Sequence, residues 1–371
     1  MRLTWDRVLA WRMRRQLLDP RSTADAVAVV RRLCGVHAQV ASSAELAVAA
    51  RQLDPHQGEV DAALATRVLM KTWAMRGTLH LLPPEQAGAY LSLVAAARSW
   101  ERPSWQRAFG VSAADMAALI DAVADALDRR VLDRDELVAE VVARTGSRHL
   151  EAQLRSGWGA LLKPLAWLGH LCHGPSKGNR VTFTRPDTWL PEWRGVPEPQ
   201  DGARFVIPAY LRAYGPARME TFDGWLTRGI SRKLDLRAWF ATLDDELVTV
   251  DVEGQECYAL AEDVDEIAAT APTTAVRLLP GFDQWVLAPG TGDERIVPAR
   301  RRSEVSKSAG WISPVVIVGG HVVGVWQLEG KTLAVRLFEE AGGVAWTALG
   351  AEAEHIEKFL ARDLRLSVAS E

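Results

Sequence analysis

Apolar residues recur at three- and four-residue intervals along the first part of the chain, a spacing that predicts short amphipathic helices. These helices are expected near residues 4–17, 23–34, 43–53 and 58–67. The next stretch, LMKTWAMRGTLHLLP (69–83), alternates apolar and polar positions on both sides of Arg76-Gly77 and predicts a β-hairpin. Short helices closed by a hairpin are the plan of a winged helix.

The same order of helices and hairpin recurs twice. Residues 112–185 predict three helices, with Ser112 and Asp133 as N-caps, followed by a hairpin whose turn is HGPSKGNR. Residues 203–262 predict three more helices and the hairpin ELVTVDVEGQECYAL. Three such units in tandem predict three winged helices.

The C-terminal part has a different texture. A Pro- and Trp-rich stretch at 185–202 predicts an ordered linker, and from Thr274 β-branched residues alternate with Gly turns, through GVAWTALG at 343–350. This predicts a small β-barrel or curled sheet, ended by a helix from about Ala351 to Arg362. The expected fold class is α+β. The expected domains are 1–110 (winged helix 1 with following helices), 111–200 (winged helix 2 and linker), 201–270 (winged helix 3) and 271–371 (β-barrel with a C-terminal helix).

Composition narrows the class of protein. The chain of 371 residues is 48% hydrophobic and 25% charged, and its three cysteines are too few for a disulfide framework. The charged, amphipathic start has no apolar core of a signal peptide, and no uncharged apolar run approaches the roughly 18 residues that span a bilayer. We expect a cytoplasmic protein without a membrane partner.

Charge is unevenly distributed along the chain. The net charge is −3, yet residues 1–110 carry 15 Lys+Arg against 9 Asp+Glu, whereas residues 203–371 carry 18 against 25. Phosphate binding needs local rather than global positive charge, so the basic N-terminal third hints at a polyanion partner. Solvated helix faces explain the same asymmetry almost as well.

Several familiar catalytic motifs are absent from the sequence. GVWQLEGKT (324–332) resembles a phosphate loop, but five residues rather than four separate its glycines, and Gly330-Lys331 is expected at a hairpin turn. HExxH, GxSxG and the dinucleotide-binding fingerprint do not occur. His170, Cys172 and His173 could join Cys34 in a metal site, but no second pair of suitable spacing exists, so a helix end running into a hairpin is favoured.

His37 and Gln39, in RRLCGVHAQVASSAE (31–45), are the strongest candidate pair. Gly35 is expected to end the preceding helix and Ser42 or Ser43 to cap the next, which leaves a non-helical connector at 35–41. In an extended connector, residues i and i+2 point to the same side, whereas in a helix they diverge by roughly 200°. Taken alone, however, the pair also fits a histidine at a helix end beside a glutamine on a loop.

Four stretches in order, GVHAQVASSAELAVAAR, MRGTLHLLP, LLPGFDQWVLA and GWISPVVIVGGHVVGVWQ, resemble the AlkZ-like DNA glycosylases over nearly the whole chain. The resemblance implies tandem winged helices and a β-barrel arranged as a C-shaped cradle on duplex DNA, and hydrolysis of the N-glycosidic bond of an alkylated base. The family signature is Gln-apolar-Gln, or Asp in the last place. Gln39 matches it, whereas His37 departs from the commonest form. The resemblance links a His-apolar-Gln variant to branches that protect antibiotic producers from their own DNA-alkylating products.

The chemistry of an alkylated purine suits such a pair. An N7-alkylguanine or N3-alkyladenine already carries positive charge, so it leaves as a neutral base without a general acid, and the enzyme mainly has to place one water at C1′. We expect Gln39 to position that water and His37 to accept its proton. Together these effects are worth about 10²–10⁴-fold or more.

Basic residues elsewhere in the sequence are candidate phosphate contacts. For the run Arg300-Arg301-Arg302, a solvated run of charges is the ordinary explanation. His80 is expected to be a packed strand residue, and Asp283 is either a support of the active site or a turn cap. The DNA-binding candidates are Arg76, Lys177, Arg180, Arg300, Arg301 and Arg302.

The sequence thus predicts a monofunctional DNA glycosylase for alkylated purines of the N7-alkylguanine type, acting as a monomer on double-stranded DNA without metal or nucleotide cofactor. No lysine adjoins the proposed site in the sequence, which disfavours a Schiff-base lyase. The alternative is a non-catalytic winged-helix DNA-binding protein, either a regulator or a drug-sequestering resistance factor. A metal-dependent hydrolase is a third, weaker possibility.

Overall fold

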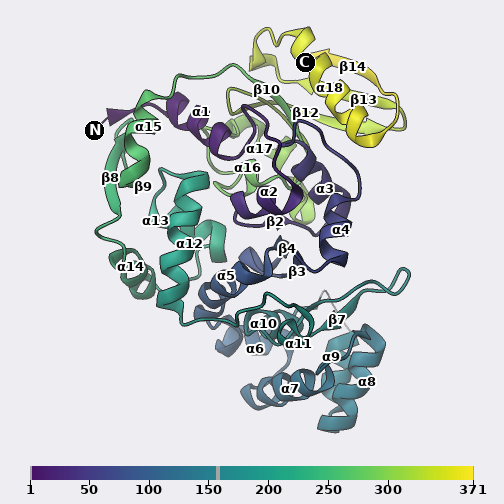
Figure 1. Ribbon diagram of the computed structural model, residues 1–371. Coiled ribbons are helices and arrows are strands. Elements are labelled where there is room, and N and C mark those ends of the chain that lie inside the picture. The colour runs from purple at the N-terminus through teal and green to yellow at the C-terminus, as the bar shows by residue number, and fades with distance from the viewer. Residues whose placement is uncertain (1, 156–158, 371) are drawn as a thin grey trace. The chain divides into compact units, whose positions relative to one another are not determined.

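The computed structural model describes residues 2–155 and 159–370 as a mixed α+β chain (Figure 1). The chain divides into two compact units. Unit 1 comprises residues 1–60, 207–225 and 243–371, and unit 2 comprises residues 61–206 and 226–242. The finer division into four domains expected from the sequence stays a prediction. Among the described residues, no helix combines the length and the apolar composition needed to cross a bilayer.

Unit 1 contains most of the strands. Its elements are β1 (Arg2–Leu3), α1 (Trp5–Arg15), α2 (Ala26–Arg32), β2 (Val36–His37), α3 (Ala41–Ala49), β8 (Leu247–Val252), β9 (Gln255–Leu260), α15 (Val264–Ala269), β10 (Val276–Leu279), α16 (Gln284–Leu287), α17 (Arg302–Val305), β11 (Val315–Val318), β12 (His321–Glu329), β13 (Thr332–Leu337), α18 (Trp346–Leu360) and β14 (Arg365–Ser370).

Unit 2 is mainly helical. Its elements are β3 (Met70–Trp73), β4 (Leu79–Leu82), α5 (Pro84–Ala96), α6 (Pro103–Phe109), α7 (Ala113–Ala126), β5 (Leu132–Asp133), α8 (Arg134–Thr145), α9 (Arg148–Arg155), α10 (Leu162–Trp167), β6 (Cys172–His173), β7 (Thr182–Thr184), α11 (Pro186–Trp189) and α14 (Lys233–Ala241). Three further helices contain the positions where the chain passes from one unit to the other: α4 (Glu59–Ala65), α12 (Pro199–Tyr214) and α13 (Met219–Thr227).

The predicted N-caps of unit 2 are confirmed. The Ser112 side chain accepts a hydrogen bond from the backbone N–H of Asp115, and Asp133 accepts one from Glu136, each as part of a reciprocal capping box at the start of α7 or α8. Such a box satisfies N–H groups that the first helical turn leaves without partners. The first residues of the next predicted helix, 156–158, lie outside the described residues.

All three predicted hairpins are present as antiparallel pairs: β3 with β4, β6 with β7, and β8 with β9. The second and third each gain a strand from earlier in the same unit, because β5 pairs with β7 and β1 pairs in parallel with β8. The order of helices followed by a hairpin therefore occurs three times along the chain.

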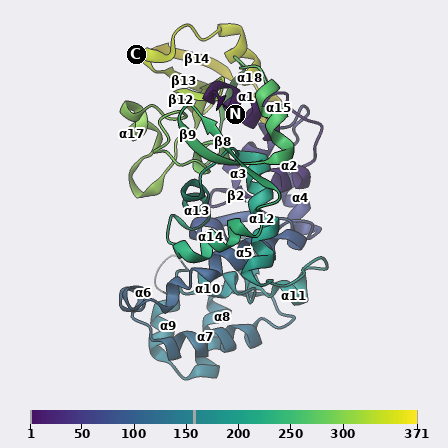
Figure 2. The same cartoon turned by 90° about the vertical axis from the view of Figure 1, so that its left-hand side faces the viewer.

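The C-terminal strands form one five-stranded sheet in the order β10-β11-β12-β13-β14. Figure 2 shows β12, β13 and β14 side by side, and α18 covers an apolar cluster on this sheet through Leu349, Ala353 and Ile356. Closure of the sheet into the expected barrel stays a prediction. A second cluster buries Trp285, whose indole N–H donates to the Gly320 carbonyl at 2.8 Å.

The prediction for the start of the C-terminal helix was wrong. The pattern placed GVAWTALG (343–350) among the strands, but α18 begins at Trp346. The buried residues Leu349, Ala353 and Ile356 recur at helical spacing. The eight residues of GVAWTALG contain only the first of them, so this segment alone does not distinguish a helix from a strand. The helices expected after the first hairpin, within residues 1–110, are α5 and α6, whereas strand β14 was not predicted.

Candidate active site

The connector between α2 and α3 carries both candidate catalytic residues. Residues 33–40 are non-helical, as predicted, and the backbone turns at Cys34 (φ 54°) and Gly35 (φ 102°). Glycine adopts such positive φ values without strain, which explains the end of α2 here. The predicted caps Ser42 and Ser43 are wrong, since α3 already begins at Ala41 and contains both serines.

Two buried side chains from distant parts of unit 1 hold this connector. The Gln284 side-chain amide donates to the Gly35 carbonyl at 3.1 Å, and the Tyr214 hydroxyl donates to the Leu33 carbonyl at 2.6 Å. Burial raises the pKa of Tyr214 well above its usual value, so the hydroxyl keeps its proton and remains a donor. The backbone on the N-terminal side of His37 is therefore fixed at two points.

His37 and Gln39 differ in exposure. His37 is buried, with 6% of its surface exposed, whereas Gln39 is exposed. The His37 ring stacks on Phe282, with centroids 4.9 Å apart and an interplanar angle of 11°. Phe282 in turn meets Trp311 edge-on at 5.0 Å, and 48% of the Trp311 surface is exposed. The Gln39 side chain is thus accessible to solvent, whereas the His37 ring is held in place by the ring of Phe282.

Phe282 occupies an unusual backbone position for an aromatic residue. Its φ is 64°, a left-handed value that costs energy in any residue with a Cβ and that tends to occur at functional sites. The preceding residue has to be glycine, because a Cβ on Gly281 would lie 2.7 Å from the Ile312 carbonyl oxygen. The turn that presents Phe282 to His37 is therefore tightly constrained.

A buried ion pair follows directly after this turn. Both carboxylate oxygens of Asp283 accept hydrogen bonds of 2.8 Å from Arg51, and exposure is 0% for the arginine side chain and 1% for the aspartate. Asp283 also caps α16 by accepting from the Trp285 backbone N–H at 2.8 Å. Asp283 is thus a helix cap, one of its two expected roles, and it also ties α16 to the end of α3.

The β3–β4 hairpin in unit 2 carries Arg76 and His80. Arg76 is half-buried in the turn, with a φ of 59°. Burial lowers the pKa of Arg76, and repulsion from Arg228 lowers it further. His80 is a packed strand residue, as expected: it is 3% exposed, and its Nδ1 donates to the Thr78 carbonyl at 3.0 Å. Burial lowers the pKa of His80 to about 4, so its ring is neutral at pH 7.

The second hairpin presents Lys177 and Arg180, paired with each other through backbone hydrogen bonds across the turn. The Lys177 ammonium lies 2.8 Å from Glu136, and the Arg180 guanidinium lies 2.9 Å from Asp133. The Lys177–Glu136 pair is exposed on both sides and contributes little to stability, whereas Arg180 is exposed but its partner Asp133 is buried.

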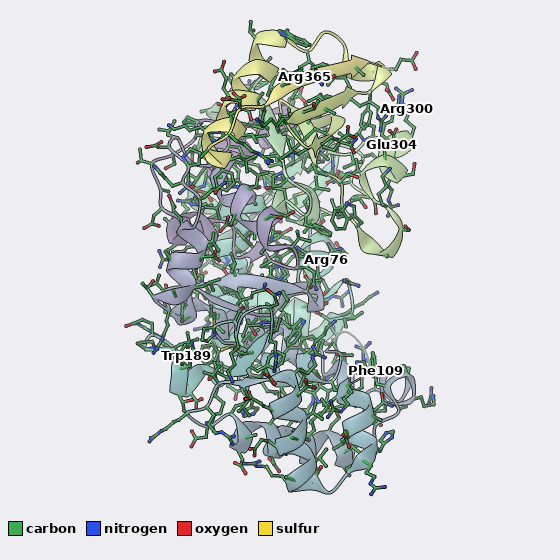
Figure 3. The ribbon with its side chains drawn as sticks, turned by 90° about the vertical axis from the view of Figure 1, so that its right-hand side faces the viewer. Arg76, Phe109, Trp189, Arg300, Glu304 and Arg365 are labelled. Atoms are coloured by element: carbon green, nitrogen blue, oxygen red, sulfur yellow. The ribbon has the colours of Figure 1, made fainter. Side chains whose placement is uncertain are left out.

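The three arginines of the run 300–302 in unit 1 differ in their ion-pair partners. Arg300 and Arg301 both pair with Glu340, and Arg301 also pairs with Glu304 at 3.0 Å, so these two are tied to the protein surface. Figure 3 shows Arg300 and Glu304 on the same side of unit 1. Arg302 is exposed and makes no ion pair within the part of the chain that the structure describes.

The cysteine and histidine cluster is packed into the interior of unit 2. His173 contacts Trp73 and Phe183 edge-on, and burial raises the pKa of the Cys172 thiol. Within residues 2–155 and 159–370, no group of three His, Cys, Asp or Glu side chains is placed to hold a metal ion. The pattern is that of an ordinary hairpin core.

Comparison with known proteins identifies the class of enzyme to which the chain belongs. The profile of the AlkZ-like DNA glycosylases matches residues 30–359. A curated relative, the interstrand DNA cross-link repair glycosylase of Streptomyces sahachiroi, is 52% identical over 359 residues, which is 96% of this chain and 97% of the relative. The protein is therefore an enzyme of the DNA glycosylase class.

The fold agrees with that class. The solved structure of the DNA glycosylase AlkZ of Streptomyces sahachiroi superposes with a TM-score of 0.97, at 50% identity and over 100% of both chains. The chain belongs to the AlkZ-like DNA glycosylase family, and its α+β fold is that of the family.

Most of the support around His37 was not predicted from the sequence. Phe282, Arg51 and Tyr214 were not singled out, although GFDQW contains a glycine before an aromatic residue and an N-cap aspartate, which together signal a constrained turn.

Proposed function

We propose that the enzyme excises cationic alkylpurines of the N7-alkylguanine type from duplex DNA, and that bulky genotoxin adducts are among its substrates. The observation that carries this proposal is the exposed Gln39 two residues after His37, in a connector fixed at Leu33 and Gly35. Its close relative is described as an interstrand DNA cross-link repair glycosylase, and cross-links are bulky adducts. Base excision of this kind would protect a producer of a DNA-alkylating antibiotic from its own product.

The proposed reaction needs little from the protein. A water held by the Gln39 side-chain carbonyl attacks C1′ while the C1′–N9 bond breaks with its electron pair going to the base. The alkylated base leaves neutral because it was already cationic. The proton of the water passes to the His37 imidazole, whose plane is fixed against Phe282. No metal, nucleotide or lysine adduct takes part in this scheme.

The grip on DNA is proposed to come from three winged helices and a barrel. In this assignment each helix-and-hairpin set is one winged helix, with domains at 1–110, 111–200 and 201–270, and residues 271–371 form the barrel with its helix, together making the C-shaped cradle. Lys177, Arg180 and Arg302 are the exposed cations that fit phosphate contacts. Arg76, Arg300 and Arg301 remain in the proposed set, with Arg300 and Arg301 as weaker contacts because they share Glu340. We propose that the enzyme acts as a monomer in the cytoplasm.

Base release from an alkylated duplex tests the catalytic assignment. His37→Ala and Gln39→Ala should each lower kcat/KM by about 10²–10⁴-fold, while binding to undamaged duplex changes little. The matched control is His56→Ala, because His56 is an exposed histidine of the same unit, and its activity should equal that of the wild type. Full activity in both the His37 and the Gln39 variants would refute the assignment.

His37→Gln separates the two possible roles of this residue. Glutamine restores the commoner family signature and can hold a water but cannot take its proton. If His37 is the base, the wild-type rate should rise with pH as the imidazole loses its proton, and His37→Gln should lose that rise. An unchanged pH profile would leave His37 with positioning alone. A protein that binds DNA yet releases no base from any alkylated duplex would favour the non-catalytic alternative for this chain.

A further inference from the structure

Unit 2 contains a cavity of about 230 Å³ that the proposed catalysis does not use. It is lined by the tip of the β3–β4 hairpin, the C-terminal end of α5, α6, α10 and the residues after α13. Arg76 and Phe109, which line it, are marked in Figure 3. Sites for drug-sized ligands measure roughly 300–1,000 Å³, so this cavity suits a smaller group.

Three cations, Arg76, Lys163 and Arg228, line the cavity, and none of its described lining residues is a carboxylate. The Lys163 ammonium lies 3.8 Å from the position that a Cβ on Gly77 would take, directly beside the hairpin turn. Burial lowers the pKa of Lys163, and repulsion from Arg228 lowers it further. In the described ranges 2–155 and 159–370, neither Lys163 nor Arg228 makes an ion pair. Lys163 is half-buried, whereas Arg228 is exposed. A half-buried ammonium that a second cation repels, with no counter-charge beside it, is stabilised by a bound anion.

One wall of the cavity is aromatic. Trp105 and Phe109 lie four residues apart on α6, so they share one face of the helix, and their ring centroids are 4.6 Å apart. Both rings are half-buried, and α6 has no buried residue, so these side chains do not serve as core anchors of the helix. Ile230, 40% exposed, extends the same apolar lining.

Cations beside open aromatic rings are the combination that holds single nucleotides, because the phosphate meets the cations and the base stacks on the rings. A neutral aromatic adduct would leave the charges of Lys163 and Arg228 without a counter-charge. Inorganic phosphate would leave the aromatic wall uncovered. Both halves of the lining are satisfied together only by a ligand with a phosphate and a flat ring.

We propose that this cavity binds one unpaired nucleotide of the DNA, with its phosphate against Arg76, Lys163 and Arg228 and its base against Trp105 and Phe109. The proposal rests on the proposed function only in taking DNA as the ligand. The ligand would be present at a damaged site, because a bulky or excised lesion leaves a nucleotide unpaired in the duplex.

Binding to two duplexes of the same sequence tests the proposal, one fully paired and one with a single unpaired nucleotide, by fluorescence anisotropy. Wild-type protein should prefer the bulged duplex. Trp105→Ala/Phe109→Ala should lose about 10-fold of that preference and keep its affinity for the paired duplex. Lys163→Ala/Arg228→Ala should also lose the preference, and the slope of log affinity against log salt should fall by about 0.7 for each phosphate that no longer meets a cation.

Trp346→Ala and Lys331→Ala are the matched controls, since both residues are exposed in unit 1, and they should bind both duplexes as the wild type does. Equal affinity of the wild type for the two duplexes, or a preference retained by both double variants, would overturn the proposal. Equal competition by inorganic phosphate and by a deoxynucleoside monophosphate would also overturn it. Base release from the alkylated duplex, measured on the same preparations, depends on His37 and Gln39, so a failure of the cavity and a failure of the proposed function give different results.

Discussion

The buried pair of Arg51 and Asp283 makes a sharp prediction about stability. The two side chains share two hydrogen bonds of 2.8 Å at 0% and 1% exposure, so removing either charge leaves the other in a low-dielectric interior. Breaking a buried pair in this way costs about 3–5 kcal/mol. Arg51→Met and Asp283→Asn should therefore each lower the free energy of unfolding by about that amount.

The double variant is the informative measurement. Arg51→Met/Asp283→Asn removes both charges together and keeps a side chain that can cap α16, so it should be destabilised less than either single variant. Asp283→Ala should cost about 1 kcal/mol more than Asp283→Asn, because alanine cannot accept from the Trp285 backbone N–H.

Equilibrium urea unfolding measures these free energies, provided that tryptophan fluorescence and far-UV circular dichroism give coincident transitions. The double-mutant cycle then yields the coupling between the two residues. Single variants that each cost less than about 1 kcal/mol, or a double variant equal to the sum of the singles, would refute the reasoning. The predicted coupling is large because the pair is both bidentate and fully enclosed.

Two further predictions concern unit 2 and backbone geometry. The folded pKa of His80 is about 4 against a usual 6.5, so the unfolded chain binds a proton first as the pH falls. The free energy of unfolding should therefore drop by about 3 kcal/mol between these two pH values. His80→Asn keeps a donor to the Thr78 carbonyl and should lose this part of the pH dependence when unfolding is measured at pH 7 and at pH 4.5. An unchanged pH dependence would contradict it. Gly88→Ala should lower stability by about 1–3 kcal/mol or more, because its Cβ would lie 1.8 Å from the Gly195 carbonyl oxygen. Gly224→Ala in α13 has open space around the new Cβ and should raise stability by about 0.5–1 kcal/mol. Thermal melts in which the two variants shift in the same direction would count against this account.

Local features were predictable from the sequence because their causes are local. A capping box joins residues three apart, as at Ser112 and Asp133, and a hairpin joins neighbouring strands through a short turn. The connector around His37 followed from Gly35 for the same reason. Helix α18 was misread where its pattern was sampled through too short a window, and α3 began one residue before its expected caps.

The support of the candidate site could not be predicted in the same way. Arg51 meets Asp283 across 232 positions, and Gln284 meets Gly35 across 249. Nothing in the local pattern around these residues specifies such partners, since the pairing arises only when α16 packs against the connector. The stacking of Phe282 on His37 came from the same long-range packing, although the family resemblance had already drawn attention to GFDQW.

The division of unit 1 among three chain segments has a consequence for how the protein is made. Arg2 pairs with Asp251 in the parallel β1–β8 ladder, so the first strand leaves the ribosome long before its partner is synthesised. At translation rates of about 5–20 residues per second, the wait is roughly 10–50 s. Residues 61–206 of unit 2 are complete by then and can begin to fold, while α1 still exposes Trp5, Val8 and Trp11, which later pack against β8 and β9. The nascent chain is therefore most exposed to chaperones through its amino-terminal helix. The connector that carries His37 gains its contacts with Phe282 and Gln284 only near the end of synthesis.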